Sequence, residues 1–437
     1  MEPRLKRRTS TEAEVEPKQL LPDDVVLEIV VRCPAIAAAS KSIRRGILHA
    51  PFLRRLQGFL IRSGGEHSHP HVRKLLVGLY RHQIGDPHRP PAFVPAHHGA
   101  DSPPPVAALP PAPDGGDCEF GAYRPVASRR SLLVLRRRCR NLARDHLVER
   151  HGLHPVELTV CNPTTGERRV LTPQDVLDTS RALLDVDPIA APSSFKLLAA
   201  ELSTNGPTTL YAQIFSSEAG EWGPRLACPV TSRLGYREGS CELAGAGCRH
   251  RPAVVGDAIH WLCTTDLGDR VLKWRWRWSD GVAWAASILK VPSPYRLGWL
   301  EKRLTAVPST GGAAGSRALL GMIVLVRGEI EVWAREKTGP FMAWKLWRRV
   351  LEASIPRPTN SHSGWLGGAE LWWFCEDSGT LLLRPGNKTM SSPLLLDLES
   401  MEVSELEAEK WEQNLEPELW PYEVDLLSYM LFLMKRF

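Results

Sequence analysis

The sequence lacks the features by which membrane-spanning, secreted and zinc-binding proteins are usually recognised. None of its apolar runs reaches the roughly 18 consecutive residues that a membrane helix requires. Residues 1–8 are charged and have no apolar region behind them, so they do not resemble a secretory signal. The nine cysteines include no Cys-x-x-Cys pair, the spacing used by zinc sites and redox dithiols. We therefore expect a cytoplasmic or nuclear protein that makes no membrane contact and keeps its cysteines reduced.

The sequence also lacks the common catalytic motifs. It has no Gly-x-Ser-x-Gly elbow, no P-loop, no Gly-x-Gly-x-x-Gly after a strand and no His-Glu-x-x-His. His67, His69 and His71, with His97 and His98 nearby, have no Cys or carboxylate partners at ligand spacing, which favours a solvated loop over a metal site. We predict a non-catalytic protein, with no catalytic residue, no cofactor and no metal.

Charge is modest for a chain of 437 residues, with a net value of +6. Arginine runs at 129–130 and 136–140 are compatible with a nucleic-acid surface, but a solvated face is the commoner explanation, so nucleic acid is an unlikely partner. In Lys273 to Trp278 tryptophan alternates with basic residues, and a strand would place the indoles and the cations on opposite faces. A stacking platform for nucleic acid needs both on one face, so we expect these indoles to pack in a core.

Local composition divides the chain into four parts. Residues 1–19 are charged and aperiodic, which predicts a disordered tail. Residues 20–56 have helical periodicity, with Pro22 opening a helix whose apolar face ends at Cys33-Pro34. Residues 57–116 form a connecting segment, in which the proline-rich stretch 86–116 predicts a linker or loop.

The fourth part, 117–437, has short apolar runs that each end at turn residues. The expected strands are 132–135, 158–161, 169–171, 210–215, 253–262 as a hairpin about Gly256-Asp257, 271–278, 322–326, 329–333, 371–374, 381–383 and 394–396. Many short strands without intervening helices predict a propeller-like or sandwich-like β domain, here ending in a short C-terminal helix. Together with the helical 20–56, the expected class is α+β.

Two groups of segments resemble a known family. Leu20 to Pro34, which begins Leu-Leu-Pro-Asp-Asp, and Lys41 to Arg55, which contains Pro51-Phe52-Leu53, resemble an F-box in combined order. Tyr123 to Leu135, Cys161 to Glu167, Val254 to Leu262 and Glu423 to Leu427 resemble the F-box-associated region of a large family of plant F-box proteins of grass type. The resemblance covers nearly the whole chain after Leu20, although the proline-rich loop and 301–317 match poorly.

This resemblance implies a substrate receptor in a ubiquitin ligase of the adaptor–cullin–F-box (SCF) type. A Skp-type adaptor would bind the N-terminal residues and link the chain to a cullin, and an unknown protein substrate would bind the β domain. The residues assigned to the adaptor are Leu21, Pro22, Val26, Ile29, Val30, Ile47, Phe52 and Leu53. The alternative for these residues is that they pack the two helices onto the β domain.

The sequence departs from the family between Pro34 and Lys41. Only Ala35 to Ser40 stand there, whereas family members usually carry one or two further helical turns. Two other functions remain open: a degenerate F-box protein that acts as a stand-alone interaction module, and, less favoured, a nucleic-acid-associated protein.

Overall fold

The structure is a computed structural model of the chain. It describes residues 52, 76–83, 91–96, 123–138, 156–172, 174, 176, 180–187, 194–203, 208–231, 242–243, 251–265, 268–276, 286–292, 301–307, 318–338, 341–356, 365–376, 378–385, 392–406 and 417–424. Nearly all of these residues lie in antiparallel strands, and two short 3-10 helices, η3 (Glu352–Ser354) and η4 (Trp365–Gly368), separate β20 from β21. No described helix is long and apolar enough to cross a membrane.

The described strands form antiparallel groups that follow one another along the chain. The first group contains β1 (Leu76–Gln83), β2 (Ala92–Pro95) and the last strand, β25 (Pro417–Glu423), and the second contains β3 (Arg124–Arg129), β4 (Leu132–Arg138), β5 (Val156–Asn162) and β6 (Glu167–Leu171). A third contains β7 (Ser180–Asp187), β8 (Ser194–Ser203), β9 (Thr209–Ser216), β10 (Glu221–Trp222) and β11 (Leu226–Thr231).

The fourth group contains β12 (Glu242–Leu243), β13 (Ala253–Val255), β14 (Ala258–Thr265), β15 (Gly268–Arg275) and β16 (Ala286–Lys290), and a short parallel pairing of β11 with β16 joins it to the third. The fifth contains β17 (Glu301–Val307), β18 (Leu319–Val326), β19 (Glu329–Thr338) and β20 (Phe341–Leu351). The sixth contains β21 (Glu370–Cys375), β22 (Thr380–Arg384), β23 (Leu394–Asp397) and β24 (Val403–Glu405).

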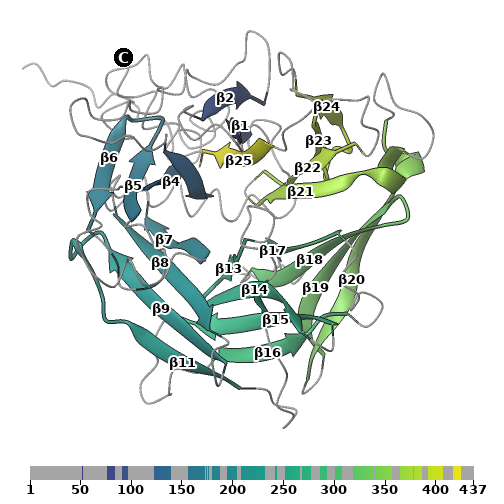
Figure 1. Ribbon diagram of the computed structural model, residues 1–437. Coiled ribbons are helices and arrows are strands. Elements are labelled where there is room, and N and C mark those ends of the chain that lie inside the picture. Colours follow the sequence, from purple (N-terminus) through teal and green to yellow (C-terminus); the bar gives the residue numbers. More distant parts are fainter. Residues whose placement is uncertain are drawn as a thin grey trace, which may run out of the picture.

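These groups are arranged in a ring around a common centre (Figure 1). One strand of each group faces the centre, and these strands contact each other in the order β3, β7, β13, β17, β21, β25 and back to β3. Buried apolar clusters fill the space between neighbouring groups, for example between the fifth and sixth, where Ile323, Ile330 and Leu371 are buried. The arrangement is propeller-like, one of the two β architectures expected from the sequence.

The ring closes because strands from opposite ends of the described chain pair. β1 runs antiparallel to β25, with Tyr80 opposite Trp420. The hydroxyl of Tyr422 in β25 also lies 2.8 Å from Thr164 Oγ1 and donates to Ser131 O at 3.1 Å, so it ties the last strand to the second group. Ser131 N donates to Glu423 O at 2.9 Å, which supports a β3–β4 turn whose Arg130 and Ser131 both have positive φ.

The expected α+β class is wrong. The described residues are mostly strands, and among them the only helical elements that follow Leu76 are the two short 3-10 helices. In the described part of the chain, each short apolar run ends at turn residues after a few positions and pairs with a neighbouring strand. The ring is also closed by a strand, β25, which pairs with β1. Of residues 20–56 only Phe52 is described, and the expected C-terminal helix lies outside the described residues.

The strands predicted in the β region are confirmed where turn chemistry defines them. Asn162 accepts hydrogen bonds through Oδ1 from Thr164 N at 3.0 Å and Thr165 N at 3.3 Å, and Gly166 adopts φ 76°, which closes the β5–β6 hairpin. The hairpin about Gly256-Asp257 is β13–β14, with Gly256 at φ 59°. These are two of the segments on which the family resemblance depends.

Strands begin earlier than the boundary expected at residue 117. β1 lies in the expected connecting segment, and β2 lies within its proline-rich stretch. β2 tolerates Pro95 because it is the edge strand of its group, where a missing N–H removes no ladder bond.

Candidate functional site

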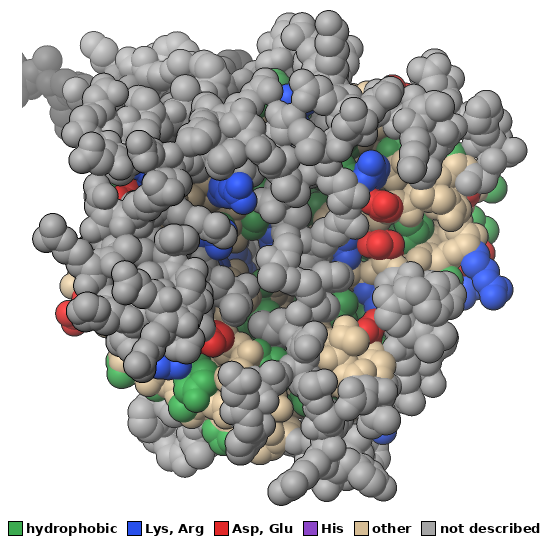
Figure 2. Space-filling view, in the orientation of Figure 1, with side chains coloured by type: hydrophobic (Ala, Val, Ile, Leu, Met, Phe, Trp, Pro, Cys, Tyr) green, Lys and Arg blue, Asp and Glu red, His purple; other side chains and the backbone are tan. Residues whose placement is uncertain are grey.

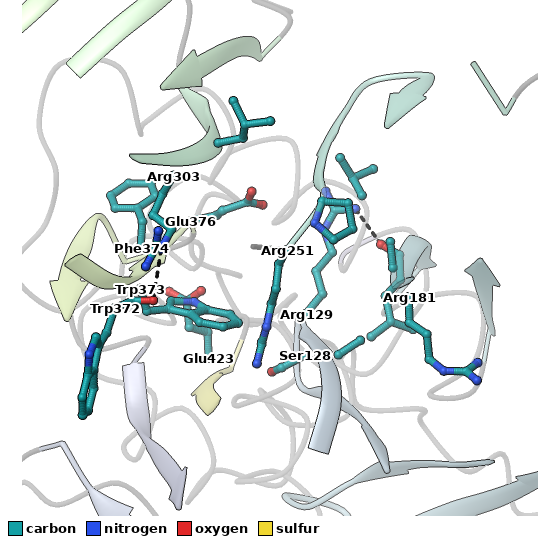
Figure 3. Close-up of a pocket in the computed structure, with 16 residues that line it drawn as sticks. Ser128, Arg129, Arg181, Arg251, Arg303, Trp372, Trp373, Phe374, Glu376 and Glu423 are labelled. Carbon is teal, nitrogen blue, oxygen red and sulfur yellow. Dashed lines mark hydrogen bonds between the residues drawn. The ribbon is translucent and has the colours of Figure 1, made fainter. Parts of the chain in front are cut away.

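The inner strands surround a cavity at the centre of the ring. Its volume is about 790 Å³ when its opening to solvent is included. Each inner strand, or the residues beside it, contributes to the wall: Arg129 from β3, Arg181 from β7, Arg251 just before β13, Arg303 from β17, Trp373 from β21 and Glu423 from β25. Four of these six residues are arginines, and in Figure 3 the side chain of Arg181 points away from the space that the others surround.

Two of the arginines join neighbouring inner strands. Arg129 donates from Nη1 to the carbonyl oxygens of Leu183 and Leu184, both at 3.0 Å, and so connects β3 to β7. Arg303 donates to the carbonyl oxygen of Leu371 and so connects β17 to β21. These bonds hold the ring together at the level of the cavity, and Arg303 is also ion-paired with Glu301, whose Oε2 lies 3.3 Å from its Nη2.

Arg251 is held by aromatic rings. Its guanidinium carbon lies 3.3 Å from the ring centre of Trp373 and also lies over the ring of Trp420. The two indoles are themselves in contact, with ring centres 5.7 Å apart. Stacking of this kind fixes the plane of a guanidinium and leaves its N–H donors directed along that plane. Figure 3 shows Arg251 extending through the middle of the lining residues.

Arg181 is buried, with 5% of its surface exposed, although it lies in a strand that is otherwise apolar on this side. Its Nη1 donates to Gln174 Oε1 at 2.9 Å. An amide oxygen orients the guanidinium without neutralising it.

Two carboxylates also line the cavity. Glu423 accepts a hydrogen bond through Oε1 from Ser378 N at 2.8 Å, and this bond connects β25 to the β21–β22 turn. Glu376 follows β21. Four arginines and two glutamates give the lining a formal charge of 4 − 2 = +2. In Figure 2 basic side chains appear near the middle of the ring face, with acidic side chains beside them.

The lining has more positive than negative charge, but its guanidinium groups already have partners within the chain: two carbonyl oxygens for Arg129, Gln174 for Arg181, two indole rings for Arg251 and Glu301 for Arg303. Among the described lining residues the one hydroxyl group that could act as a nucleophile is that of Ser128. The lining contains no histidine that could act as its base. Within the described part of the chain, no group of three or more His, Cys, Asp or Glu side chains is placed to hold a metal.

The residues that the sequence assigned to an adaptor lie mostly outside the described residues. This applies to Leu21, Pro22, Val26, Ile29, Val30, Ile47 and Leu53. Phe52 is described, and its side chain is buried, with 7% of its surface exposed.

Sequence reasoning missed the cavity. Arg129 belongs to a run that we expected to face solvent, and Arg137 of the second run is also buried. The available signal was a basic residue inside an apolar strand, as in Ser180-Arg181-Ala182-Leu183-Leu184. Such a signal can identify a single buried arginine, but it does not predict that the four arginines line one cavity. That follows only from the topology of the ring.

A family model matches part of the chain. The family described as "Domain of unknown function (DUF7595)" matches residues 108–287, which run from before β3 to the middle of β16. Comparison with curated proteins finds no match.

Among solved structures, a proposed 6-phosphogluconolactonase from Bacteroides fragilis is 11% identical, with a TM-score of 0.30 over 59% of this chain and 64% of that one. The N-terminal domain of Nup159 is 12% identical, with a TM-score of 0.26 over 63% and 61%. The β-propeller domain of the Trilobed protease from Pyrococcus furiosus is 10% identical, with a TM-score of 0.23 over 65% and 97%. The chain thus spans less than two thirds of the first two, and similarity at this level supports no functional inference.

Proposed function

We propose that the chain is a non-catalytic substrate receptor of an adaptor–cullin–F-box ubiquitin ligase. The observation that carries the proposal is the combination of two features in one chain. Residues 20–55 resemble an F-box in the order of their Leu-Pro start and Pro-Phe-Leu end. The rest forms a propeller-like ring whose cavity draws its lining from all six inner strands.

Such a receptor contributes to ubiquitin transfer by positioning its substrate. It holds a substrate near a ubiquitin-loaded enzyme, and the rate of transfer rises because the effective concentration of the acceptor lysine rises. The ring suits this role because it fixes loops and a cavity on a rigid scaffold, and binding surfaces on loops can change without disturbing the core. No reacting group is required of the chain itself.

Binding of the full-length chain to a plant Skp-type adaptor tests the proposal. Ile29→Asp places a charge on the apolar face assigned to the adaptor, and we expect it to abolish co-purification because an unpaired buried charge is costly. Arg44→Gln, on the face expected to be solvated, is the matched control and should leave co-purification unchanged. Equal recovery of adaptor with both variants would contradict the assignment.

A second candidate is a stand-alone interaction module that no longer engages the adaptor. The observation that favours it is the short 35–40 segment. In that case the full-length chain would bind no adaptor at all, while its β ring would still capture a partner.

A further inference from the structure

The outermost strand of the fifth group carries most of the large apolar side chains that the described structure leaves exposed. Within the described part of the chain four such side chains are exposed, and three of them, Met342, Trp347 and Leu351, lie on β20. Between 37% and 47% of each of these three is accessible to solvent. One exposed apolar residue is ordinary on a protein surface, but three on a single strand indicate a surface that binds a partner.

β20 is also an edge strand. Among the described strands it pairs with β19 alone, and Figure 1 shows it on the outer side of the ring. An edge strand leaves a row of backbone N–H and C=O groups that can pair with a strand from another chain. Met342 and Leu351 lie nine positions apart in this strand, a span of about 30 Å. Contacts spread along such a line fit an extended peptide better than a compact small molecule.

Exposed residues alternate with covered ones along the second half of β20. The exposed residues are Lys345, Trp347, Arg349 and Leu351, and the residues between them are half-buried or buried. A β-bulge lies within this stretch and makes Trp347 the extra residue between Leu346 and Arg348, which oppose successive residues of β19. The exposed side chains thus follow the two-residue period of an extended peptide laid beside them.

The exposed charge on β20 is positive. Lys345 Nζ lies 3.8 Å from Glu336 Oε2, and Arg349 Nη2 lies 2.8 Å from Glu331 Oε1. In each pair the cation is the exposed member, since 70% of the Lys345 side chain is accessible against 20% for Glu336, and 51% of Arg349 against 3% for Glu331. A partner that approaches β20 therefore meets the cations first. Because exposed ion pairs contribute little, Lys345 can contact a further carboxylate at small cost.

The composition of β20 disfavours two other occupants, a second copy of the chain and nucleic acid. The strand contains Lys345, Arg348 and Arg349 and no carboxylate, so two antiparallel copies would bring like charges together along one seam. A bulge and an edge lysine also discourage pairing between copies of an exposed strand. Nucleic acid fits poorly because Met342 and Leu351 offer apolar contact where a phosphate chain needs positive charge.

We propose that the outer edge of β20 binds an extended segment of a partner protein by strand addition, with Trp347 and Leu351 as apolar contacts and Lys345 as the contact for an acidic side chain. Backbone pairing supplies affinity, and an exposed tryptophan supplies a contact of the kind that often dominates an interface. This binding is independent of the proposed function, because β20 belongs to the ring and the adaptor is assigned to residues before Gly58.

Calorimetry of the full-length chain with a peptide of about ten residues, in which valine and glutamate alternate, tests this proposal. The comparisons are the same peptide with every amide nitrogen methylated, a valine–lysine peptide of equal length and a single-stranded oligonucleotide. Methylation removes the N–H groups that strand addition needs, and lysine reverses the charge that Lys345 meets. We therefore expect the valine–glutamate peptide to bind, and the other three to bind at least about tenfold more weakly.

Two substitutions separate the apolar contact from the charge. Trp347→Ser should weaken binding of the valine–glutamate peptide about fivefold or more. Val170→Ser changes an exposed apolar residue on β6, the edge strand of another group, and should leave that binding unchanged. Lys345→Glu should weaken binding of the valine–glutamate peptide and strengthen that of the valine–lysine peptide about threefold or more, a gain that misfolding cannot imitate.

No binding of the valine–glutamate peptide by the parent chain, equal binding of its methylated form, equal affinities in the two serine variants, or preference for the oligonucleotide would overturn the proposal. A dimer in sedimentation that Trp347→Ser dissociates would assign the edge to a second copy instead. Adaptor binding measured on the same samples should be unaffected by Trp347→Ser, so failure of peptide binding contradicts only the β20 proposal.

Discussion

At the scale of single residues, His260 shows how burial sets a charge state. It lies in β14 with 4% of its surface exposed, and burial, with Lys273 and Arg335 nearby, lowers the pKa of its imidazole from 6.5 to about 3. The folded protein therefore keeps His260 neutral over a range where the unfolded chain would bind a proton. Stability from this residue is present above pH 6.5 and is lost as pH falls toward 3.

His260→Gln should remove this pH dependence. Between about pH 6.5 and pH 5 the parent should lose up to roughly tenfold in folding constant per pH unit from one extra proton in the unfolded state. The variant should lose less over the same range. Urea unfolding at several pH values measures both slopes, and parallel slopes would show that His260 does not titrate in this way.

The alternation in Lys273 to Trp278 predicts indoles packed in a core, and the structure confirms this for Trp274 and Trp276; Trp278 lies outside the described residues. Trp274 and Trp276 are 1% and 6% exposed and belong to one core cluster, while Arg275 between them is exposed. Trp276→Ala should therefore lower the free energy of unfolding by about 3–5 kcal/mol. Arg275→Ala should change it by less than about 0.5 kcal/mol. Denaturant titrations that gave equal values for both would place Trp276 outside the core.

At the scale of elements, β25 is the closing strand of the ring. Besides its ladder with β1, it depends on Tyr422, whose buried hydroxyl contacts Thr164, Ser131 and Asn162. All three of these residues lie in segments that carry the family resemblance, Cys161 to Glu167 and Tyr123 to Leu135. The segments far apart in sequence thus meet at one hydrogen-bonded point.

Tyr422→Phe should weaken this closure. Removal of the hydroxyl leaves buried oxygen and hydroxyl groups without that partner, and we expect a loss of about 1–3 kcal/mol in the free energy of unfolding. Tyr211→Phe, on a half-buried tyrosine of β9, is the control and should lose less than about 0.5 kcal/mol. If the two variants unfolded at the same denaturant concentration, the Tyr422 hydroxyl would have no role in closure.

The strands that the sequence predicts correctly are those that flank turns specified by a few neighbouring residues. Asn162 to Gly166 and Gly256-Asp257 specify turns by themselves, so the strands around them were predictable. The β1–β25 pairing was not, because it joins residues more than 300 positions apart, and nothing in Leu76–Gln83 identifies its partner. On the other side of β1, Gly78 allows the close approach of β2, since a side chain there would overlap the carbonyl oxygen of Val94 and the ring of Phe93.

At the scale of the whole molecule, closure of the ring creates the site. Arg129, Arg181, Arg251 and Arg303 lie up to 174 positions apart, and no local sequence pattern links them. Only after six inner strands meet do their charges add. The class error concerns the described residues, which are mostly strands; residues 20–56, apart from Phe52, lie outside them.

The most direct test of the central claim is calorimetry of the full-length chain against a plant Skp-type adaptor. The Leu-Pro start and the Pro-Phe-Leu end are retained, but the 35–40 segment lacks one or two aliphatic contacts, each contributing roughly 1.5–3 kcal/mol. We therefore predict binding about ten- to a thousand-fold weaker than that of an F-box of usual length. No detectable heat at high micromolar concentrations would contradict a ligase receptor and leave the stand-alone module.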